Sequence, residues 1–600
     1  MRKINSISLK NNAYYNKTVL NSVDLANIAY VDNSMIWAFG ICNNLKYVNN
    51  FNENIINMTN AFNGCRNLTN VSEIPDSVTD MVNCFYGCSN LKYEPKISNG
   101  VVNLKSAFRG CSNLPSITLE NCSNLLDMKE AFWSCTKLID VPEIPDSVTN
   151  MAFTFYSCYN IENFNKMGNA ITNMSNSFYN CTNLKNADTL TDSVVDMTNT
   201  FQSCTKLESV SHIPNNVTNM YRTFSSCYKL NYVGDMDNCT NLTNMYYTFF
   251  RCNNIENAPI LPDSVTNIDM DNCFLQCSNL VNVPHIPNSV TTMSNTFESC
   301  SKLNYVGDMD SCIKLNNMSR TFYGCKNLIN APILPNSVTN MYGTFWSCEK
   351  LVNVPIIPEN VSNMYLTFSN CKSLINAPVI PENVIDMFKT FDSCCCLENV
   401  GEIPNSVTNM YGTFSGCYNL VNITKLSHNI TNLAFTFESC TSLENAPEIP
   451  NSVTSMYNSF SRCNRLINIP KIPDSVTYMY STFGSCTNLI IPPVLSNSVV
   501  NMQYAFQQCT KLSSAPIIPN TVISMLSTFS YCNQLTGNIF IYSEIINVIS
   551  GCFTGTLEKN VYIPFQNNGV NTITYNTFIN YGYSTDTRKN GVLLFDINNI

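Results

Sequence analysis

Large apolar residues recur along this chain with a period of 23 residues. One complete repeat begins at Met341 and ends at Asn363, and Met364 begins the next. In its first half Met341, Phe345 and Cys348 are spaced i, i+4 and i+7, which is the spacing that places side chains on one face of a helix. This half of the repeat therefore predicts a short helix.

The second half of the repeat has the pattern of an extended segment. Leu351, Val354 and Ile357 occupy its apolar positions, and prolines lie between and after them. Because proline has no N–H to donate, only a short strand is expected here. The Pro-Asp-Ser or Pro-Asn-Ser step of many repeats, as at residues 75–77 and 404–406, has turn chemistry and returns the chain to the next repeat.

Cysteine marks the register of the repeat. Twenty-two of the 30 cysteines, from Cys42 to Cys532, fall at the same place in it, and of the 21 intervals between them 17 are 23 residues, one is 24 and three are 25. A single repeat cannot bury its apolar edge alone, whereas stacked repeats make a continuous core in which equivalent residues lie above one another. The sequence therefore predicts one solenoid of about 22 coils rather than the roughly four globular domains that its length alone would suggest.

Three parts of the chain are expected. Residues 1–34 lack the repeat and are expected to cap one end, and residues 35–552 form the solenoid. Residues 553–600 form a β-rich C-terminal cap or attachment segment, because apolar runs at 561–565 and 591–595 frame turn signals at 567–569 and 581–583.

Irregular coils interrupt the repeat in its middle. Two of the 25-residue coils share the sequence Val-Gly-Asp-Met-Asp-x-Cys, at residues 233–239 and 306–312, which lie 73 residues apart. The coils that follow them also match, which indicates that a block of three coils was duplicated. The third long coil carries its insertion at residues 268–272.

These repeats resemble the BspA-like bacterial leucine-rich repeat surface proteins. The Ile-Pro-x-Ser-Val-Thr half, residues 403–408, is similar to the Treponema-type repeat of 23 residues. The half formed by Met410, Phe414, Cys417 and Leu420 is similar to the Mycoplasma-type surface repeat. The resemblance covers residues 35–552 and implies a leucine-rich-repeat solenoid with a short strand and a short helix in each coil. The Ile-Pro pair lies one residue later than in the Treponema-type repeat, so an irregular strand is expected.

Charge and composition exclude several classes of function. The net charge is −9, and Lys and Arg do not cluster as they would on a surface for nucleic acid or an anionic membrane. The basic start of the chain is followed by no apolar stretch of a signal peptide, and no run reaches the length of a membrane span. Synthesis in the cytoplasm, no direct membrane insertion and reduced cysteines are therefore expected. The final localisation is left open between virion incorporation and non-classical surface display.

Metal and catalytic chemistry find little support in the sequence. The commonest cysteine spacing is 23, so small buried thiols explain the ladder better than metal sites, which need ligand pairs at short spacing. Local cysteine clusters have no convincing histidine partners, and the three histidines are expected to be surface loop residues. Two Asp-x-Asp turns are either solvated or offer oxygen ligands to a cation or glycan. The residues concerned are Cys84/Cys88, Cys273/Cys277, Cys394/Cys395/Cys396, His212, His285, His428, Asp235/Asp237 and Asp308/Asp310.

No catalytic motif is present, neither G-x-S-x-G, H-E-x-x-H nor a Walker A run. We therefore expect no catalytic residue, no cofactor, no metal and no enzymatic activity.

An aromatic residue follows the methionine in several coils, and in four consecutive coils these rings are expected to stack into a stripe. Such a stripe either shields the flank of the core or forms a platform for a protein or sugar partner, since tyrosine gives rigid, amphipathic contact area. The residues are Tyr342, Tyr365, Phe388, Tyr411, Tyr457 and Tyr480, with Tyr221 and Tyr246 earlier in the chain.

The sequence favours a binding or adhesion protein that presents an extended repeat surface to a protein or glycan on a host or neighbouring cell. The tail is similar to terminal segments of repeat proteins from gut bacteriophages and their hosts, so a bacterial surface protein and a phage virion component both fit. Two alternatives stay open. One is a polysaccharide-degrading fibre built as a parallel β-helix, which would need two facing carboxylates, and the other is an intracellular scaffold or effector.

Overall fold

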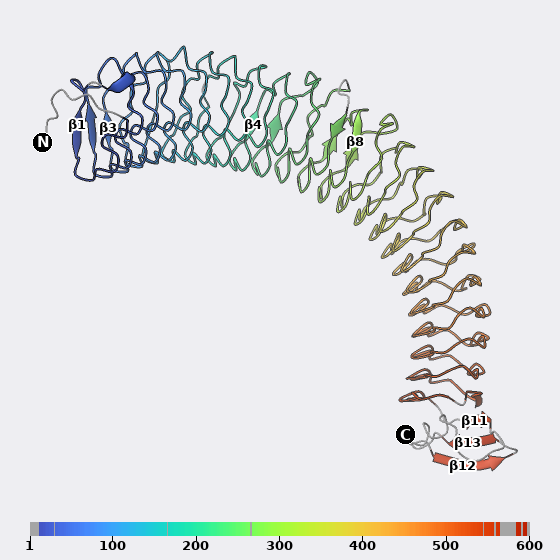
Figure 1. Cartoon of the computed structure of the whole chain (residues 1–600). Helices are drawn as coiled ribbons and strands as arrows, with labels where there is room; N and C mark the ends of the chain where they lie inside the picture. Colours follow the sequence, from blue (N-terminus) through green and yellow to red (C-terminus); the bar gives the residue numbers. More distant parts are fainter. Residues whose placement is uncertain are drawn as a thin grey trace. The chain divides into compact units, whose positions relative to one another are not determined.

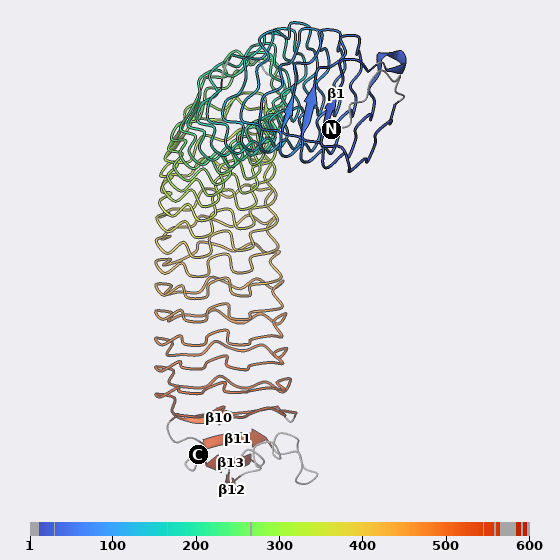
Figure 2. The ribbon, with the colours of Figure 1, turned by 90° about the vertical axis from the view of Figure 1, so that its left-hand side faces the viewer.

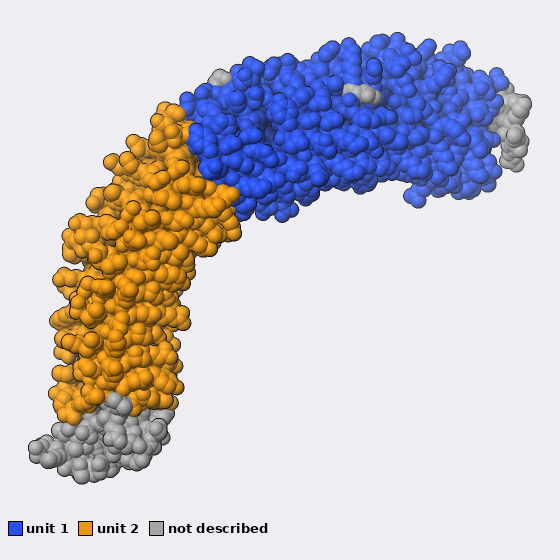
Figure 3. Space-filling model, turned by 180° about the vertical axis from the view of Figure 1, so that it is seen from behind, with its two compact units in different colours: residues 1–307 blue, residues 308–600 orange. Residues whose placement is uncertain are grey.

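The repeats fold into coils that stack directly on one another (Figure 1). The computed structural model describes residues 11–28, 30–164, 166–263, 267–543, 545–556, 560–564, 584–589 and 592–596. The coils belong to two compact units, residues 1–307 and 308–600 (Figure 3). Within the second unit, successive coils lie as flat rungs above one another (Figure 2).

The first half of the coil is not a helix, so the predicted helix in each coil is wrong. Among the described residues the only helical element is the 3-10 turn η1, Val31–Asn33. In the coil that begins at Met341, Gly343 and Ser347 adopt φ values of 57° and 58°, and comparable residues recur through the solenoid. A left-handed residue at every fourth position cannot belong to a right-handed helix, so the segment folds as successive tight turns.

Backbone hydrogen bonds explain this choice of turns. Within the coil, the Thr344 N–H donates to the Met341 carbonyl over 3.1 Å, whereas the Phe345 N–H donates to the Thr367 carbonyl of the next coil over 2.9 Å. Alternate N–H groups thus bond locally and to the neighbouring coil. The turns also repeat every four residues, so Met341 and Phe345 still point to the same side and are completely buried.

The extended half of the coil pairs in parallel with its neighbours over only one to three residues. Most coils form single bridges, such as Asn330 with Asn353. Prolines remove ladder donors and keep the pairing short. The strands of the solenoid are β1 (Ser22–Asp24), β2 (Tyr47–Asn49) and β3 (Asn70–Val71) in one sheet, and the pairs β4 (Ser209–Val210) with β5 (Tyr232–Val233), β6 (Ile268–Asp269) with β8 (Val290–Thr292), and β7 (Asn282–Val283) with β9 (Tyr305–Val306).

The last coil contributes β10 to a four-stranded sheet, in the order β10-β11-β13-β12. The first pair is parallel and the other two are antiparallel. The turn signals at 567–569 and 581–583 lie outside the described residues, and the division of the chain at residues 34 and 552 stays a prediction. The strands are β10 (Asn538–Phe540), β11 (Asn560–Pro564), β12 (Ser584–Lys589) and β13 (Val592–Asp596).

A ladder of phenylalanine rings runs through the core of each unit. In the first unit it extends from Phe39 to Phe297, with neighbouring ring centroids 4.9–5.7 Å apart. In the second unit it extends from Phe322 to Phe553, with spacings of 5.1–5.9 Å. The prediction that one 23-residue repeat makes one coil with its large apolar side chains buried is confirmed.

The cysteine ladder serves the backbone as well as the core. The Cys371 thiol donates to the carbonyl of Phe345 in the preceding coil over 3.1 Å, and the Thr367 hydroxyl donates likewise to Met341 over 2.9 Å. Both donors are completely buried, and equivalent bonds recur in most coils. A thiol at this position therefore fills a small apolar space and also donates a hydrogen bond to a buried acceptor. The sequence predicted only the first of these two roles.

Asparagine shapes the entry to the turns. The side-chain oxygen of Asn340 accepts the Tyr342 N–H over 3.0 Å, and its amide nitrogen donates to the Asn317 side chain of the preceding coil over 3.1 Å. Such local bonds hold the chain in a turn. Asparagine therefore recurs at this place in many coils, for example at Asn363, Asn409 and Asn432.

Candidate binding surface

Aromatic side chains that follow the methionines stack in the second unit. The ring centroids of Tyr342 and Tyr365 lie 5.1 Å apart, those of Tyr365 and Phe388 lie 4.4 Å apart, and those of Phe388 and Tyr411 lie 5.0 Å apart. The planes of the last two pairs differ by only 7° and 4°. The structure therefore brings these four predicted site residues into one stack.

Two rings that the sequence analysis missed extend this stack. Phe435 lies 5.2 Å from Tyr411 and 5.1 Å from Tyr457, and Tyr504 lies 5.2 Å from Tyr480. Tyr457 and Tyr480 stack on each other at 4.8 Å. The eight rings are named here the aromatic row: Tyr342, Tyr365, Phe388, Tyr411, Phe435, Tyr457, Tyr480 and Tyr504.

Phe435 and Tyr504 were missed because each stands two residues after its core apolar residue instead of one. They reach the row from left-handed backbone, with φ of 57° and 56°. Their planes are consequently tilted by 51° to 61° against their neighbours. A search for aromatics at both positions after the core residue would have found them.

Rings in the row are half-buried. Burial raises the pKa of the Tyr365 hydroxyl, and the nearby Tyr342 adds to this effect. Burial also raises the pKa of Tyr480. Because a stacked neighbour lies on each face of Tyr365 and Phe388, these rings offer a partner their rims, and Tyr365 also its hydroxyl, rather than their faces.

A hollow of 530 Å³ adjoins the row and is lined by Trp346, Tyr365, Phe388, Lys389 and Asp392, among others. Burial raises the pKa of the Asp392 carboxyl, although Lys389 and three serine hydroxyls oppose the shift. No motif in the sequence pointed to Lys389 or Asp392. They are found only when neighbouring coils are stacked, because the residues that surround them come from different repeats.

The first unit carries smaller aromatic groups. Tyr221 and Tyr246, which the sequence placed in the predicted stripe, stack on each other with their ring centroids 5.8 Å apart. They are not members of the aromatic row. Another group forms around Trp133, whose ring lies 4.3 Å from that of Tyr156 and 3.7 Å from the guanidinium carbon of Arg109. Glu130 forms an ion pair with Arg109. This group contains no long stack comparable with the aromatic row.

Two of the three histidines join neighbouring coils. The Nε2 atom of His212 lies 2.9 Å from an Asp192 oxygen, and that of His285 lies 2.9 Å from an Asp263 oxygen. All four side chains are exposed, so these pairs lie on the surface as the sequence predicts for the histidines. The aspartates belong to the Pro-Asp-Ser and Thr-Asp-Ser turns of the preceding coils, a partnership that the spacing in sequence did not reveal. The third histidine, His428, is exposed in its turn.

The carboxylates of the Asp-x-Asp turns accept hydrogen bonds from backbone N–H groups. One oxygen of Asp308 accepts the Ile333 N–H of the next coil over 3.0 Å, and Asp235 accepts the Ile260 N–H over 3.4 Å. In the described part of the chain, no three histidine, cysteine or acidic side chains converge as a metal site would require. These turns therefore carry no support for a bound cation.

The local cysteine clusters differ in exposure. Cys84, Cys88, Cys273 and Cys277 are completely buried, and burial raises the pKa of each of these thiols. Cys395 and Cys396 are half-buried, so a reagent in solvent can reach them. The first two clusters are thus part of the core.

Comparison with known proteins identifies the repeat. The family model of the BspA type leucine rich repeat region matches overlapping segments that together span residues 7–585. No curated protein is similar enough in sequence to count as a relative. Among the described residues, no helix has the length and apolar character needed to cross a bilayer.

Two solved structures of repeat proteins are similar to this chain at low sequence identity. A leucine-rich repeat protein from Bacteroides ovatus is 22% identical, with a TM-score of 0.39 over 63% of this chain and 82% of its own. A leucine rich cell surface protein from Faecalibacterium prausnitzii is 20% identical, with a TM-score of 0.20 over 74% of this chain and 82% of its own. On the family match, which covers nearly the whole sequence, the chain belongs to the BspA-type leucine-rich repeat family.

Proposed function

We propose that this protein is a non-catalytic binding protein and that the aromatic row is its contact surface. The observation that carries the proposal is the continuity of the row, whose eight rings come from eight successive coils with centroids 4.4–5.2 Å apart. Tyrosine and other aromatic side chains supply large contact area at little cost in conformational entropy, and they dominate many interfaces. Stacking further restricts their rotation before a partner arrives.

A protein partner fits the row better than a stacked sugar. Sugars that bind aromatic side chains need an accessible ring face, and stacked neighbours lie on both faces of Tyr365 and Phe388. Ring rims and hydroxyls suit a protein surface that lies along the solenoid. The adjoining hollow beside Trp346 and Lys389 offers space for an anchoring side chain of the partner.

Display at a cell or virion surface completes the proposal. Membership of the BspA-type family favours a partner on a host or neighbouring cell. The β-rich tail suits attachment to the cell or virion that displays the protein. The second candidate, a polysaccharide-degrading fibre built as a parallel β-helix, would require coils of a different repeat class. The family match argues against it, because it assigns the coils to leucine-rich repeats.

The test replaces Tyr342, Tyr365 and Tyr411 together with serine. We expect binding of the labelled protein to a panel of bacterial and epithelial cells to weaken by at least about tenfold, because the central anchors are removed. Circular dichroism and thermal unfolding establish that the coils remain folded.

A matched control replaces Tyr418, Tyr478 and Tyr531, which are exposed in the same unit but lie outside the row. This variant should bind as the native protein does. Protease treatment of the cells should abolish binding, whereas enzymatic removal of glycans should not. Equal binding of the native protein and the row variant would refute the proposal.

A further inference from the structure

A second surface of the second unit carries one exposed side chain from each of ten successive coils. The residue lies immediately before the Ile or Leu of the proline-rich half, which is buried in nine of the ten coils, as Ile356 lies before Ile357. Successive members are 23 residues apart and therefore stack above one another. All ten are exposed, and they are named here the outer column: Ile333, Ile356, Val379, Glu402, Lys425, Glu448, Lys471, Val494, Ile517 and Phe540.

Apolar side chains occupy both ends of this column. Ile356 is 89% exposed and Val379 is 86% exposed, while Val494 and Ile517 are 68% and 60% exposed. Isolated apolar residues are normal on a surface, but aligned groups of this kind mark interaction sites. Ile333 and Phe540 extend the two groups by one coil each.

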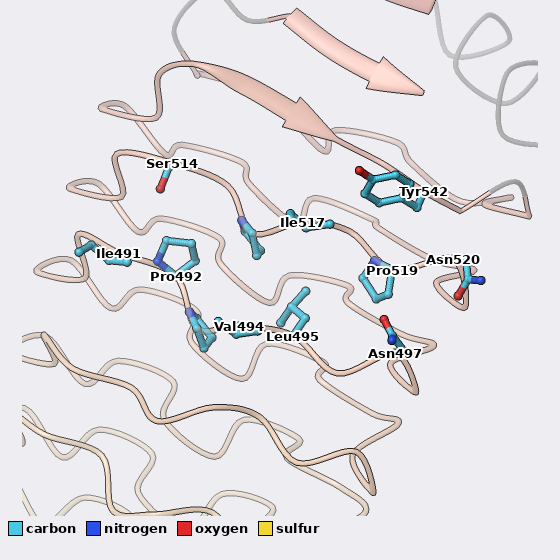
Figure 4. Close-up of a pocket in the computed structure, with 12 residues that line it drawn as sticks. Ile491, Pro492, Val494, Leu495, Asn497, Ser514, Ile517, Pro519, Asn520 and Tyr542 are labelled. Carbon is cyan, nitrogen blue, oxygen red and sulfur yellow. The ribbon is translucent and has the colours of Figure 1, made fainter. Parts of the chain in front are cut away.

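The two apolar ends differ in shape. Val494 and Ile517 line a hollow of 840 Å³ together with Pro492, Leu495 and Tyr542. Figure 4 shows that these side chains come from successive coils and surround an open depression. At the other end, Ile356 and Val379 project into solvent. One end of the column is therefore a recess and the other a pair of protruding side chains.

Charges fill the middle of the column with alternating sign, in the order Glu402, Lys425, Glu448, Lys471. Read in the opposite direction, this order places a lysine wherever the forward order has a glutamate. The apolar ends also exchange places on reversal. The outer column is therefore complementary to an antiparallel copy of itself.

We propose that two copies of this chain associate through the outer column, related by a two-fold axis that passes between Lys425 and Glu448. Lys425 then faces Glu448 of the second copy, and Glu402 faces Lys471. Ile356 and Val379 of each copy cover Ile517 and Val494 of the other, and they enter its recess. Such an interface uses the same patch on both copies, as closed dimers do.

Other registers of the two copies fail on charge or burial. Parallel copies would place Glu402 against Glu402 and Lys425 against Lys425, and like charges in contact oppose association. An antiparallel shift by one coil would bury Val379 or Val494 against a charge. Only the register proposed here matches every position of the column.

The dimensions are sufficient for a stable dimer. Ten coils at about 4.8 Å per coil give a contact about 43 Å long. At this length, the ~800 Å² on each copy that is usual for a specific interface is reached at a width of roughly 18 Å, so residues that flank the column also contact the second copy. The apolar ends supply most of the affinity, whereas the charges set register and orientation.

The experiment uses two charge variants of the full chain. Glu402→Lys with Glu448→Lys makes the middle of the column all lysine, and Lys425→Glu with Lys471→Glu makes it all glutamate. We expect the native protein to sediment as a dimer in analytical ultracentrifugation. Each variant alone should show a dissociation constant raised by at least about tenfold, because four like charges face four.

Mixing the two variants should restore the dimer, because every lysine then faces a glutamate. Since all substituted side chains are exposed, their thermal unfolding should match that of the native chain. Val379→Asp should also weaken the dimer, whereas Ile385→Asp, which changes an exposed residue outside the column, should not. A monomeric native protein, dimeric single variants or a mixture that stays monomeric would each overturn the proposal.

Discussion

Individual side chains in this protein form hydrogen bonds with the backbone of the neighbouring coil. Cys371 and Thr367 each donate to a carbonyl of the coil before them, so their polar atoms are satisfied inside the core. A buried acceptor without a partner costs about 1–3 kcal/mol. Repetition of the same donors at the same positions therefore follows from the need to satisfy the same carbonyls in every coil.

Asp392 is a residue whose ionisation opposes stability. Burial raises the pKa of its carboxyl above the ordinary value that it has in the unfolded chain. The protonated carboxyl therefore contributes fully to stability when the pH lies below the ordinary pKa of the unfolded chain. This contribution is lost as the pH rises through the raised pKa of the folded state. At neutral pH the ionised carboxylate is a cost to the folded state.

Replacement of Asp392 by asparagine should accordingly raise the free energy of unfolding at pH 7, by on the order of 1 kcal/mol or less because the site is partly open to solvent. The gain should disappear at pH 3, where both forms are neutral. Denaturant unfolding at the two pH values measures this difference. Glu398→Gln, an exposed acid in the same coil, serves as the control, and a larger gain at pH 3 than at pH 7 would contradict the assignment.

At the scale of the element, the repeating turn depends on a buried ring at its centre. Phe345 is completely buried and lies between Phe322 and Phe368 in the core ladder, with centroids 5.4 and 5.5 Å away. The turn around it contains left-handed Gly343 and Ser347. Loss of the ring would remove contacts with both neighbouring coils at once.

Phe345→Asp should therefore destabilise the second unit by more than about 4 kcal/mol, because it removes the ring and buries an unpaired charge. Phe345→Leu should cost only about 1–2 kcal/mol, since it keeps an apolar side chain in place. Thermal unfolding followed by circular dichroism compares the two. An unchanged melting temperature in the aspartate variant would place Phe345 outside the core.

For the whole molecule, stability is distributed over many similar interfaces. Each coil contacts mainly its neighbours, as in other repeat proteins, and most coils contribute a completely buried thiol. Burial raises the pKa of such thiols, to about 12 in Cys158, so almost no reactive thiolate exists at neutral pH. The number of protected thiols therefore reports how many coils are folded.

Brief alkylation of the native protein with iodoacetamide should modify no more than Cys395 and Cys396, because the other 28 of the 30 cysteines are buried. The same treatment in denaturant should modify all 30. Intact-mass spectrometry counts the adducts. Rapid modification of many more thiols in the native protein would contradict the stacked core.

The sequence by itself determined the repeat length, the identity of the buried residues and the alignment of the aromatic positions. These follow from spacing along the chain, and stacking converts equal spacing into spatial alignment. The prediction of a helix was wrong because the i, i+4 spacing of Met341 and Phe345 occurs both in a helix and in turns that repeat every four residues. Only the carbonyls of the next coil decide between them, since they accept every second N–H.

Tertiary structure alone also decided which surface residues meet. Phe435 enters the aromatic row through left-handed backbone, His212 meets Asp192 across a coil boundary, and the exposure of Val379 depends on how its coil lies on its neighbours. In each case the environment of the side chain is formed by a neighbouring coil and not by the repeat that contains the residue. A one-dimensional pattern specifies which residues are equivalent, whereas the direction of each side chain is set by the coils on either side.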